Sequence, residues 1–264
     1  MAGILYIGAG VGMGFVYLFR RLKGSSSEYA SERFTRADLP YVVAMIALDI
    51  AAPIFLLFGL SHSSAASASL LNNFEIVATA LIALAAFKEK ISARLWAGIL
   101  FVTASCVLLS FEDLSGFNLS FGSVFILLAC VCWGVENNCT RRLSSKDPLV
   151  IVLLKGTFSG VGSVIIAFAI GERITVLWSV LAVLAVGFVA YGLSIFFYVY
   201  AQRTLGAART SAYYAVAPFI GVLLSLLIFR DVPEITFFVA LTVMAVGAWL
   251  CSKDEPISIF NKKK

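Results

Sequence analysis

Long apolar segments alternate with short polar ones along nearly the whole chain. A helix needs about 20 mostly apolar residues to cross the hydrocarbon core of a bilayer. Nine segments are this long, at about residues 2–19, 39–60, 65–87, 93–111, 121–140, 149–170, 176–200, 208–229 and 234–252. The pattern therefore predicts an all-α fold, a polytopic membrane bundle of nine transmembrane helices.

The composition supports the same fold class. Hydrophobic residues make up 61% of the 264 residues, charged residues make up 13%, and the mean hydropathy is +0.97. Soluble domains are roughly half apolar and about a quarter charged. An aqueous core cannot hold this surplus of apolar side chains, so the surplus must face membrane lipid.

Lysine and arginine gather in alternate loops, which orients the predicted helices. The odd-numbered loops and the tail hold most of them, at Arg20, Arg21, Lys23, Arg33, Arg36, Lys88, Lys90, Arg94, Arg141, Arg142, Lys146, Arg203, Arg209, Lys253, Lys262, Lys263 and Lys264. Short loops rich in these residues stay on the cytoplasmic side. We therefore expect a multi-pass protein of the cytoplasmic membrane, with a cytoplasmic C-terminus and with the N-terminus of this chain outside. The net charge of +5 is a topology signal here and does not indicate a nucleic-acid partner.

Residues 55–110 match the stretch 142 positions further on without a gap. Ser69 falls on Ser211, and the charged step at Lys88 falls on Arg230. By the charge rule one step lies inside and the other outside, so the two copies run in opposite directions, as in inverted-repeat transporters.

This match predicts how the chain is divided. We expect a first repeat of four helices over residues 1–115, a second repeat of five over 116–252, and a basic cytoplasmic tail over 253–264. Inversion requires an odd number of helices in each copy. One helix is therefore expected to be missing before the first four.

Three sets of residues carry a family resemblance. They are residues 70–75 (LLNNFE) with 87–92 (FKEKIS), residues 215–221 (AVAPFIG) with 229–231 (FRD), and residues 132–134 (CWG) with 140–142 (TRR). They resemble the signatures of EamA-type members of the drug/metabolite transporter superfamily over nearly the whole chain. The resemblance implies ten helices in two inverted repeats, both termini in the cytoplasm, and export or exchange of small metabolites. The chain departs from it by the missing first helix and by Ile76, where that family commonly has proline.

Asp49 and Glu75 are the ionisable residues expected near the membrane midplane. Each lies roughly 15 Å from one end of its helix, and no cation is expected at that depth. Two carboxylates in a low dielectric cannot both ionise cheaply. They predict a proton-coupling pair or a binding site for a cationic group, and the alternative is that both only specify helix packing.

Other polar residues are expected around these acids. Asn72 shares a helix face with Glu75 because of their spacing. The repeat match places Asp49 on Tyr191 and Asn72 on Tyr214, so both tyrosines are candidates for the lining of the same cavity. Ordinary aromatic packing is the alternative for the tyrosines.

Glu136 and Lys155 form a second polar group, on adjacent helices at similar depth. Lys155 lies roughly 9 Å inside its helix, which predicts an ion pair with Glu136. This pair is a structural lock between neighbouring helices, or the lysine only extends toward the membrane surface. The functional alternative is that Lys155 contacts an anion or shifts the pKa of the midplane acids. Pro53 and Pro218 are expected in mid-helix, where proline removes a backbone hydrogen bond and permits a hinge.

These features favour a secondary transporter that works by alternating access. The expected substrate is a small metabolite or drug-like molecule, cationic or zwitterionic for preference, moved by proton coupling or exchange; efflux is what the family resemblance implies. A lipid-linked sugar flippase of the same superfamily is an alternative, but its cavity should hold several basic residues. A non-transporting membrane protein is another, and it should have a soluble domain or a long loop. A homodimer also stays an alternative.

An enzyme is disfavoured by the residue types within the spans. No histidine lies in a span, and neither HExxH nor GxSxG occurs, so no nucleophile and base are predicted together. The five cysteines contain no CxxC pair and are interpreted as small hydrophobic residues. We expect no cofactor and no metal site.

Overall fold

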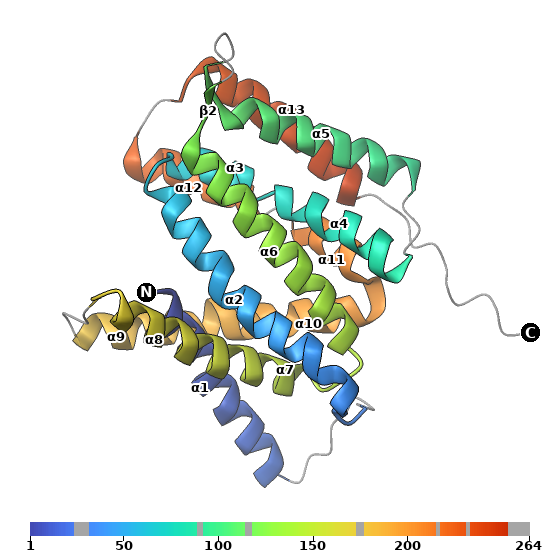
Figure 1. Ribbon diagram of the computed structural model, residues 1–264, viewed down its shortest axis with the longest axis vertical. Coiled ribbons are helices and arrows are strands. Elements are labelled where there is room, and N and C mark those ends of the chain that lie inside the picture. The colour runs from blue at the N-terminus through green and yellow to red at the C-terminus, as the bar shows by residue number, and fades with distance from the viewer. Residues whose placement is uncertain are drawn as a thin grey trace, which may run out of the picture. The chain divides into compact units, whose positions relative to one another are not determined.

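The computed structural model describes residues 1–23, 32–88, 92–113, 118–172, 177–214, 217–230 and 233–252. Most of these residues are helical (Figure 1). Several sequence predictions fall outside the described residues, namely those on the motif residues 89–91, 215–216 and 231, and on the tail 253–264.

The helices of the first half of the chain are α1 (Ala2–Leu22), the short turn η1 (Arg36–Asp38), α2 (Leu39–Leu60), α3 (Ala65–Leu71), α4 (Phe74–Phe87) and α5 (Ala93–Ser110). Strand β1 (Phe111–Asp113) pairs antiparallel with β2 (Asn118–Leu119). The second half contains α6 (Phe121–Leu143), α7 (Pro148–Leu154), η2 (Lys155–Ser159), α8 (Gly160–Ala169), α9 (Leu177–Val186), η3 (Gly187–Leu193), α10 (Ser194–Leu205), α11 (Ala207–Tyr214), α12 (Ala217–Phe229) and α13 (Ile235–Ser252).

The expected polytopic helix bundle is confirmed. Within the described residues, six helical segments are long and apolar enough to cross a membrane, and three shorter apolar helices accompany them. The strand pair between α5 and α6 is a short hairpin in one loop and leaves the fold class unchanged. The count of nine spans and the two inverted repeats stay predictions.

Three of the predicted spans are not uniform α-helices within the described residues. Asn72 and Asn73 separate α3 from α4. The segments η2 and η3 are π-helical and interrupt the spans that α7 and α9 begin. Such local changes of helix type often occur at functional sites.

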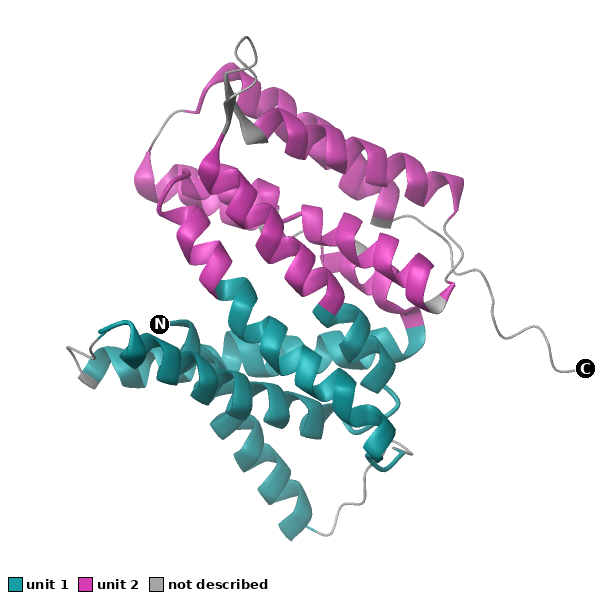
Figure 2. Cartoon of the chain, viewed as in Figure 1, with its two compact units in different colours: residues 1–53, 136–204 teal, residues 54–135, 205–264 magenta. Residues whose placement is uncertain are grey.

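The chain divides into two compact units (Figure 2). Unit 1 contains residues 1–53 and 136–204, and unit 2 contains residues 54–135 and 205–264. Each unit takes helices from both halves of the chain, so the units do not follow the predicted repeats. The chain passes from one to the other directly after Pro53 in α2 and directly before Glu136 in α6.

In unit 1, α1 packs against η2 and η3 through glycines. A Cβ atom added at Gly156 would lie 2.3 Å from the backbone nitrogen of Gly10, and one added at Gly187 would lie 2.2 Å from the carbonyl oxygen of Leu5. Only residues without a side chain permit backbones to approach this closely, as is common between membrane helices. These contacts hold the two π-helical segments directly against α1.

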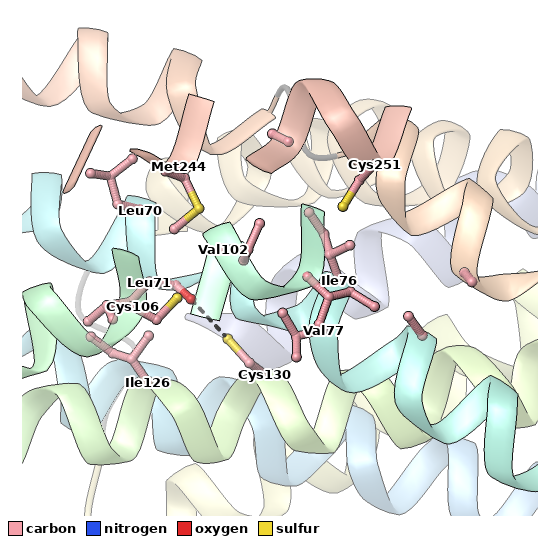
Figure 3. Packing of buried hydrophobic residues seen from close by; sticks show 14 of the residues in the cluster. Leu70, Leu71, Ile76, Val77, Val102, Cys106, Ile126, Cys130, Met244 and Cys251 are labelled. Atoms are coloured by element: carbon pink, nitrogen blue, oxygen red, sulfur yellow. Dashed lines mark hydrogen bonds between the residues drawn. The ribbon is translucent and has the colours of Figure 1, made fainter. Parts of the chain in front are cut away.

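Unit 2 has its own apolar core, built from α3, α4, α5, α6, α11, α12 and α13. Leu70, Leu71, Val102 and Met244 are among its fully buried members (Figure 3). Cys130 packs among them, and its thiol points to the carbonyl oxygen of Leu71 at 3.6 Å. This contact satisfies a carbonyl close to the interruption between α3 and α4.

Candidate functional site

Three ionisable side chains meet in the interior of unit 1, each on a different helix. Lys155 Nζ lies 2.8 Å from Glu136 Oε1 and 3.3 Å from Asp49 Oδ2. The side chains of Lys155, Glu136 and Asp49 are only 6%, 4% and 1% exposed. The ion pair expected between Glu136 and Lys155 is thus present, and Asp49 joins it. We call these three residues the ion cluster.

The expectation that no cation lies at the depth of Asp49 is wrong. Asp49 lies ten residues after the start of α2, about 15 Å along that helix. Lys155 reaches it from η2 although its own backbone lies only about 10 Å from the start of α7. The long, flexible side chain of Lys155 spans that difference in depth. Asp49, which was predicted as part of one polar group, therefore contacts the pair Glu136 and Lys155, which was predicted as another.

Two hydrogen-bond donors reach the carboxylate of Glu136. Its Oε1 atom accepts hydrogen bonds from Lys155 Nζ and from the hydroxyl of Thr140, which lies one turn later on α6. Residues four apart on a helix are neighbours, so the spacing of Thr140 already placed a donor beside this acid. Two donors from different helices therefore meet at one oxygen of Glu136.

The carboxylate of Asp49 accepts one hydrogen bond from the described residues. Its Oδ1 atom accepts a hydrogen bond of 3.1 Å from the hydroxyl of Tyr6 on α1. No hydrogen bond from the described residues reaches Oδ2, whose 3.3 Å contact with Lys155 is an ion pair without hydrogen-bond alignment. The ring of Tyr191 on η3 meets the ring of Tyr6 edge to face, with centroids 5.2 Å apart. Tyr191 therefore lies next to the ion cluster and contacts Asp49 through Tyr6.

The close packing of α1 explains how Tyr6 reaches this place. The carbonyl oxygen of Tyr6 lies 2.8 Å from where a Cβ atom of Gly156 would be, so α1 runs against the residue that follows Lys155. Both π-helical segments contribute to the site, since Lys155 opens η2 and Tyr191 lies within η3. Sequence reasoning missed Tyr6 because a single tyrosine in an apolar run shows no periodicity.

The remaining predicted site residues lie in unit 2. Asn72 and Glu75 are half-buried on either side of the interruption between α3 and α4, and Tyr214 is 48% exposed at the end of α11. Asn73, which the sequence did not single out, is 1% exposed, and its side-chain amide has no hydrogen-bond partner among the described residues. A shared lining of Asn72, Glu75 and the two tyrosines stays a prediction.

The two prolines occupy different positions. Pro53 lies inside α2, as expected. Pro218 is the second residue of α12, and residues 215–216 before it lie outside the described part of the chain, so its mid-helix position stays a prediction. Within the described residues, Pro53 removes a backbone hydrogen bond from a continuous helix. The hinge role of either residue stays a prediction.

A second polar network ties the short α6–α7 loop to other parts of unit 1. Arg203 on α10 donates to the carbonyl oxygens of Ser144, Ser145 and Lys146 at 2.8, 2.9 and 3.0 Å. Lys146 Nζ contacts Glu32 Oε2 at 3.3 Å and Asp38 Oδ2 at 3.2 Å. The hydrogen bond from Ser145 and the contact with Lys146 hold the pKa of Glu32 below its ordinary value. We call these residues the loop network.

Catalytic and metal-binding arrangements are not found in the described part of the chain. No group of three His, Cys, Asp or Glu residues there could hold a metal ion. Cys106, Cys130 and Cys251 are buried, Cys132 and Cys139 are half-buried, and none of the five forms a disulfide. All three members of the ion cluster are ionisable, so they can bind charge and transfer protons.

A bundle of membrane-spanning helices with buried ionisable groups and interrupted spans is the architecture of a membrane transporter. The EamA-like transporter family matches residues 1–111 and 120–253, so the chain belongs to that family. The resemblance noted from the sequence motifs is thereby confirmed. The proteins of this family are transporters and are not enzymes.

Relatives and a solved structure agree with this assignment. An "uncharacterized transporter" of Methanothermobacter thermautotrophicus is 25% identical over 83% of this chain and 66% of its own length. The "uncharacterized inner membrane transporter YedA" of Escherichia coli K12 is 30% identical over 49% of this chain and 43% of its own length. The matches thus span less than two thirds of either relative. A crystal structure matches with a TM-score of 0.68 at 18% identity, covering 95% of this chain and 85% of that one, which shows a shared fold.

Proposed function

We propose that this protein is a secondary transporter that moves a small cationic or zwitterionic metabolite across the cytoplasmic membrane by alternating access. The observation that carries the proposal is the ion cluster, three charged groups buried within the spans of a chain from a transporter family. Ionisable residues inside membrane spans are rare and typically mark ion or substrate pathways.

A purely structural role explains the ion cluster less well. Removing charges from water costs several kcal/mol for each ion, and well-packed apolar residues of similar size are often as stabilising as a buried ion pair. The surrounding helices of unit 1 are rich in apolar side chains that could fill the same space. A role in binding substrate or a coupling ion explains why charged residues, and not apolar ones, occupy this space.

The interrupted spans support the alternating-access part of the proposal. Transporters often bind substrate where spanning helices are broken, because freed backbone groups face a cavity there. The interruption at Asn72 and Asn73 lies beside Glu75. We propose that Asn72, Glu75 and Tyr214 contact substrate in unit 2, and that Pro53 permits α2 to bend. Tyr191 of unit 1 is proposed separately, as a neighbour of the ion cluster.

The charge of the described site argues against a lipid-linked sugar flippase. A phosphate group requires basic partners, whereas the ion cluster has two acids for one lysine. Its excess of acid favours a substrate or coupling ion with positive charge. The direction of transport proposed is efflux, either against a proton or by exchange.

Transport by the purified protein in liposomes tests the proposal. Uptake of radiolabelled lysine, arginine, putrescine, alanine and glutamate is measured for the wild type, for Asp49→Asn and for the control Glu172→Gln, whose carboxylate is exposed after α8. We expect uptake of a cationic or zwitterionic compound by the wild type and the control, and none by Asp49→Asn. Wild-type rates in Asp49→Asn would contradict the role of the ion cluster.

A further inference from the structure

The charges of the ion cluster do not balance. Two carboxylates, Asp49 and Glu136, face a single ammonium group, that of Lys155. Among the described residues, Tyr6 on α1 interacts electrostatically with both acids, Tyr191 on η3 interacts with Tyr6, and Cys139 on α6 interacts with Glu136 and Lys155; these three are neutral when protonated. With both acids ionised, the ion cluster therefore carries a formal charge of −1.

A net charge at this place has little compensation. The three side chains are at most 6% exposed, so water does not screen them. An uncompensated buried charge is strongly destabilising, and groups in that situation commonly neutralise by binding a proton. One monovalent positive charge, added to either acid, brings the ion cluster to zero.

The two acids differ in the hydrogen-bond donors that reach their carboxylate oxygens. Glu136 Oε1 receives donors from Lys155 and Thr140, while Asp49 Oδ2 receives no hydrogen bond from the described residues. A proton that binds Oδ2 forms an O–H bond, leaves the Tyr6 contact on Oδ1 in place, and leaves Lys155 paired with Glu136. Asp49 is therefore the acid at which neutralisation disturbs the fewest contacts.

A metal cation fits this place poorly. Hard cations such as sodium need several oxygen ligands. Lys155 Nζ already lies 3.3 Å from Oδ2 and would repel a second cation. A proton needs one oxygen atom and no cage, so it suits the geometry.

We propose that Asp49 binds one proton within the neutral cluster Asp49–Lys155–Glu136, and that this proton is the coupling ion. Loss of the proton returns a charge of −1 to the contact between α2 and η2, beside the glycine contacts with α1. The coupling part rests on the proposed function, whereas the binding of the proton does not.

Infrared spectroscopy of the full chain in lipid nanodiscs tests the proposal, because a protonated carboxyl group has its own C=O stretching band. At neutral pH, the number of buried carboxylic acids follows from charge balance. We expect one in the wild type, none in Asp49→Asn, none in Glu136→Gln, where Asp49 and Lys155 balance each other, and two in Lys155→Met. The exposed control Glu172→Gln should match the wild type.

Each outcome decides the proposal. A wild type without the band, or a band that persists in Asp49→Asn, overturns it, as does loss of the wild-type band on adding sodium chloride at constant pH. If Asp49→Asn does not fold, as judged by gel filtration, the counts for Glu136→Gln and Lys155→Met decide alone. The measurement uses no substrate, so the expected bands in a protein that transports nothing would support the proton site while refuting transport.

Discussion

Pro53 follows Asp49 by four residues in α2, so the residue without a backbone N–H is the one that would otherwise donate to the carbonyl oxygen of Asp49. The missing helical hydrogen bond of α2 therefore lies at Asp49, the acid of the ion cluster that receives fewer hydrogen bonds. The boundary between the two compact units also follows Pro53 directly.

Pro53→Ala should stabilise the protein and slow transport. The alanine N–H gives the Asp49 carbonyl a donor, worth about 1 kcal/mol, and stiffens α2 where we propose that it bends. A change of this size corresponds to a factor of about five in a two-state equilibrium, and the initial rate in liposomes should fall by a similar factor.

Pro148→Ala is the matched control for Pro53→Ala. Pro148 is the first residue of α7, where its missing N–H interrupts no helical hydrogen bond. Thermal unfolding in detergent and the initial rate should change little. Equal effects of the two substitutions would contradict a specific role for Pro53.

Gly156→Ala should destabilise unit 1 by about 1 to 3 kcal/mol, the usual range for inserting a methyl group into a packed interior. The new Cβ atom would lie 2.3 Å from the backbone nitrogen of Gly10, which cannot move without α1. Gly14→Ala is the control, since its Cβ atom would lie 3.4 Å from the end of the Leu153 side chain, an ordinary contact. Thermal unfolding should separate them, and unfolding of both at the same temperature would contradict the close packing of α1.

Arg203→Lys should weaken the loop network nearly as much as Arg203→Ala. The guanidinium group reaches three carbonyl oxygens because its donors form a planar fork, and a lysine ammonium cannot reproduce that geometry. We expect each variant to lose about 1 to 3 kcal/mol of unfolding free energy, because buried carbonyls lose their donors. The control is Arg21→Lys at an exposed position. If Arg203→Lys unfolds like the wild type, the fork geometry is unimportant.

Particular residues show how far the sequence could predict this site. Glu136 and Lys155 were predictable as a pair because they lie at similar depth on consecutive helices. The contact of Asp49 with Lys155 was not, because α2 is distant from η2 in the chain and only tertiary packing decides which helices meet. The π-helical segments were missed as well, since they depend on packing against α1 and not on local propensity. The separation of α3 from α4 at two adjacent asparagines had a visible signal, because asparagine favours caps and turns over helix interiors.

Glu75→Gln should abolish transport while leaving expression and membrane insertion intact. Glu75 lies in the first turn of α4, beside the interruption at Asn72 and Asn73, where we propose that substrate binds. The amide keeps the size of the side chain and removes its charge. Uptake in liposomes and yield after purification are compared with those of Glu172→Gln, and wild-type uptake would remove Glu75 from the proposed site.

Lys155→Met should cause the largest loss of stability among these substitutions. Removing one partner of a buried ion pair typically costs about 3 to 5 kcal/mol. In Lys155→Met both acids lose their counter-charge and must bind protons to become neutral. Glu136→Gln removes an acid and leaves Lys155 with Asp49, so its loss should be smaller.

The double variant with Lys155→Met and Glu136→Gln measures the interaction between the two residues. It leaves a single acid that can bind a proton, and its loss should be smaller than the sum of the two single losses by at least about 1 kcal/mol. Reversible unfolding in detergent provides the three free energies, with the exposed Lys23→Met as the control for removing a charge from the same residue type. Losses that simply add would show that Lys155 and Glu136 contribute independently, and the ion cluster would then not act as one unit.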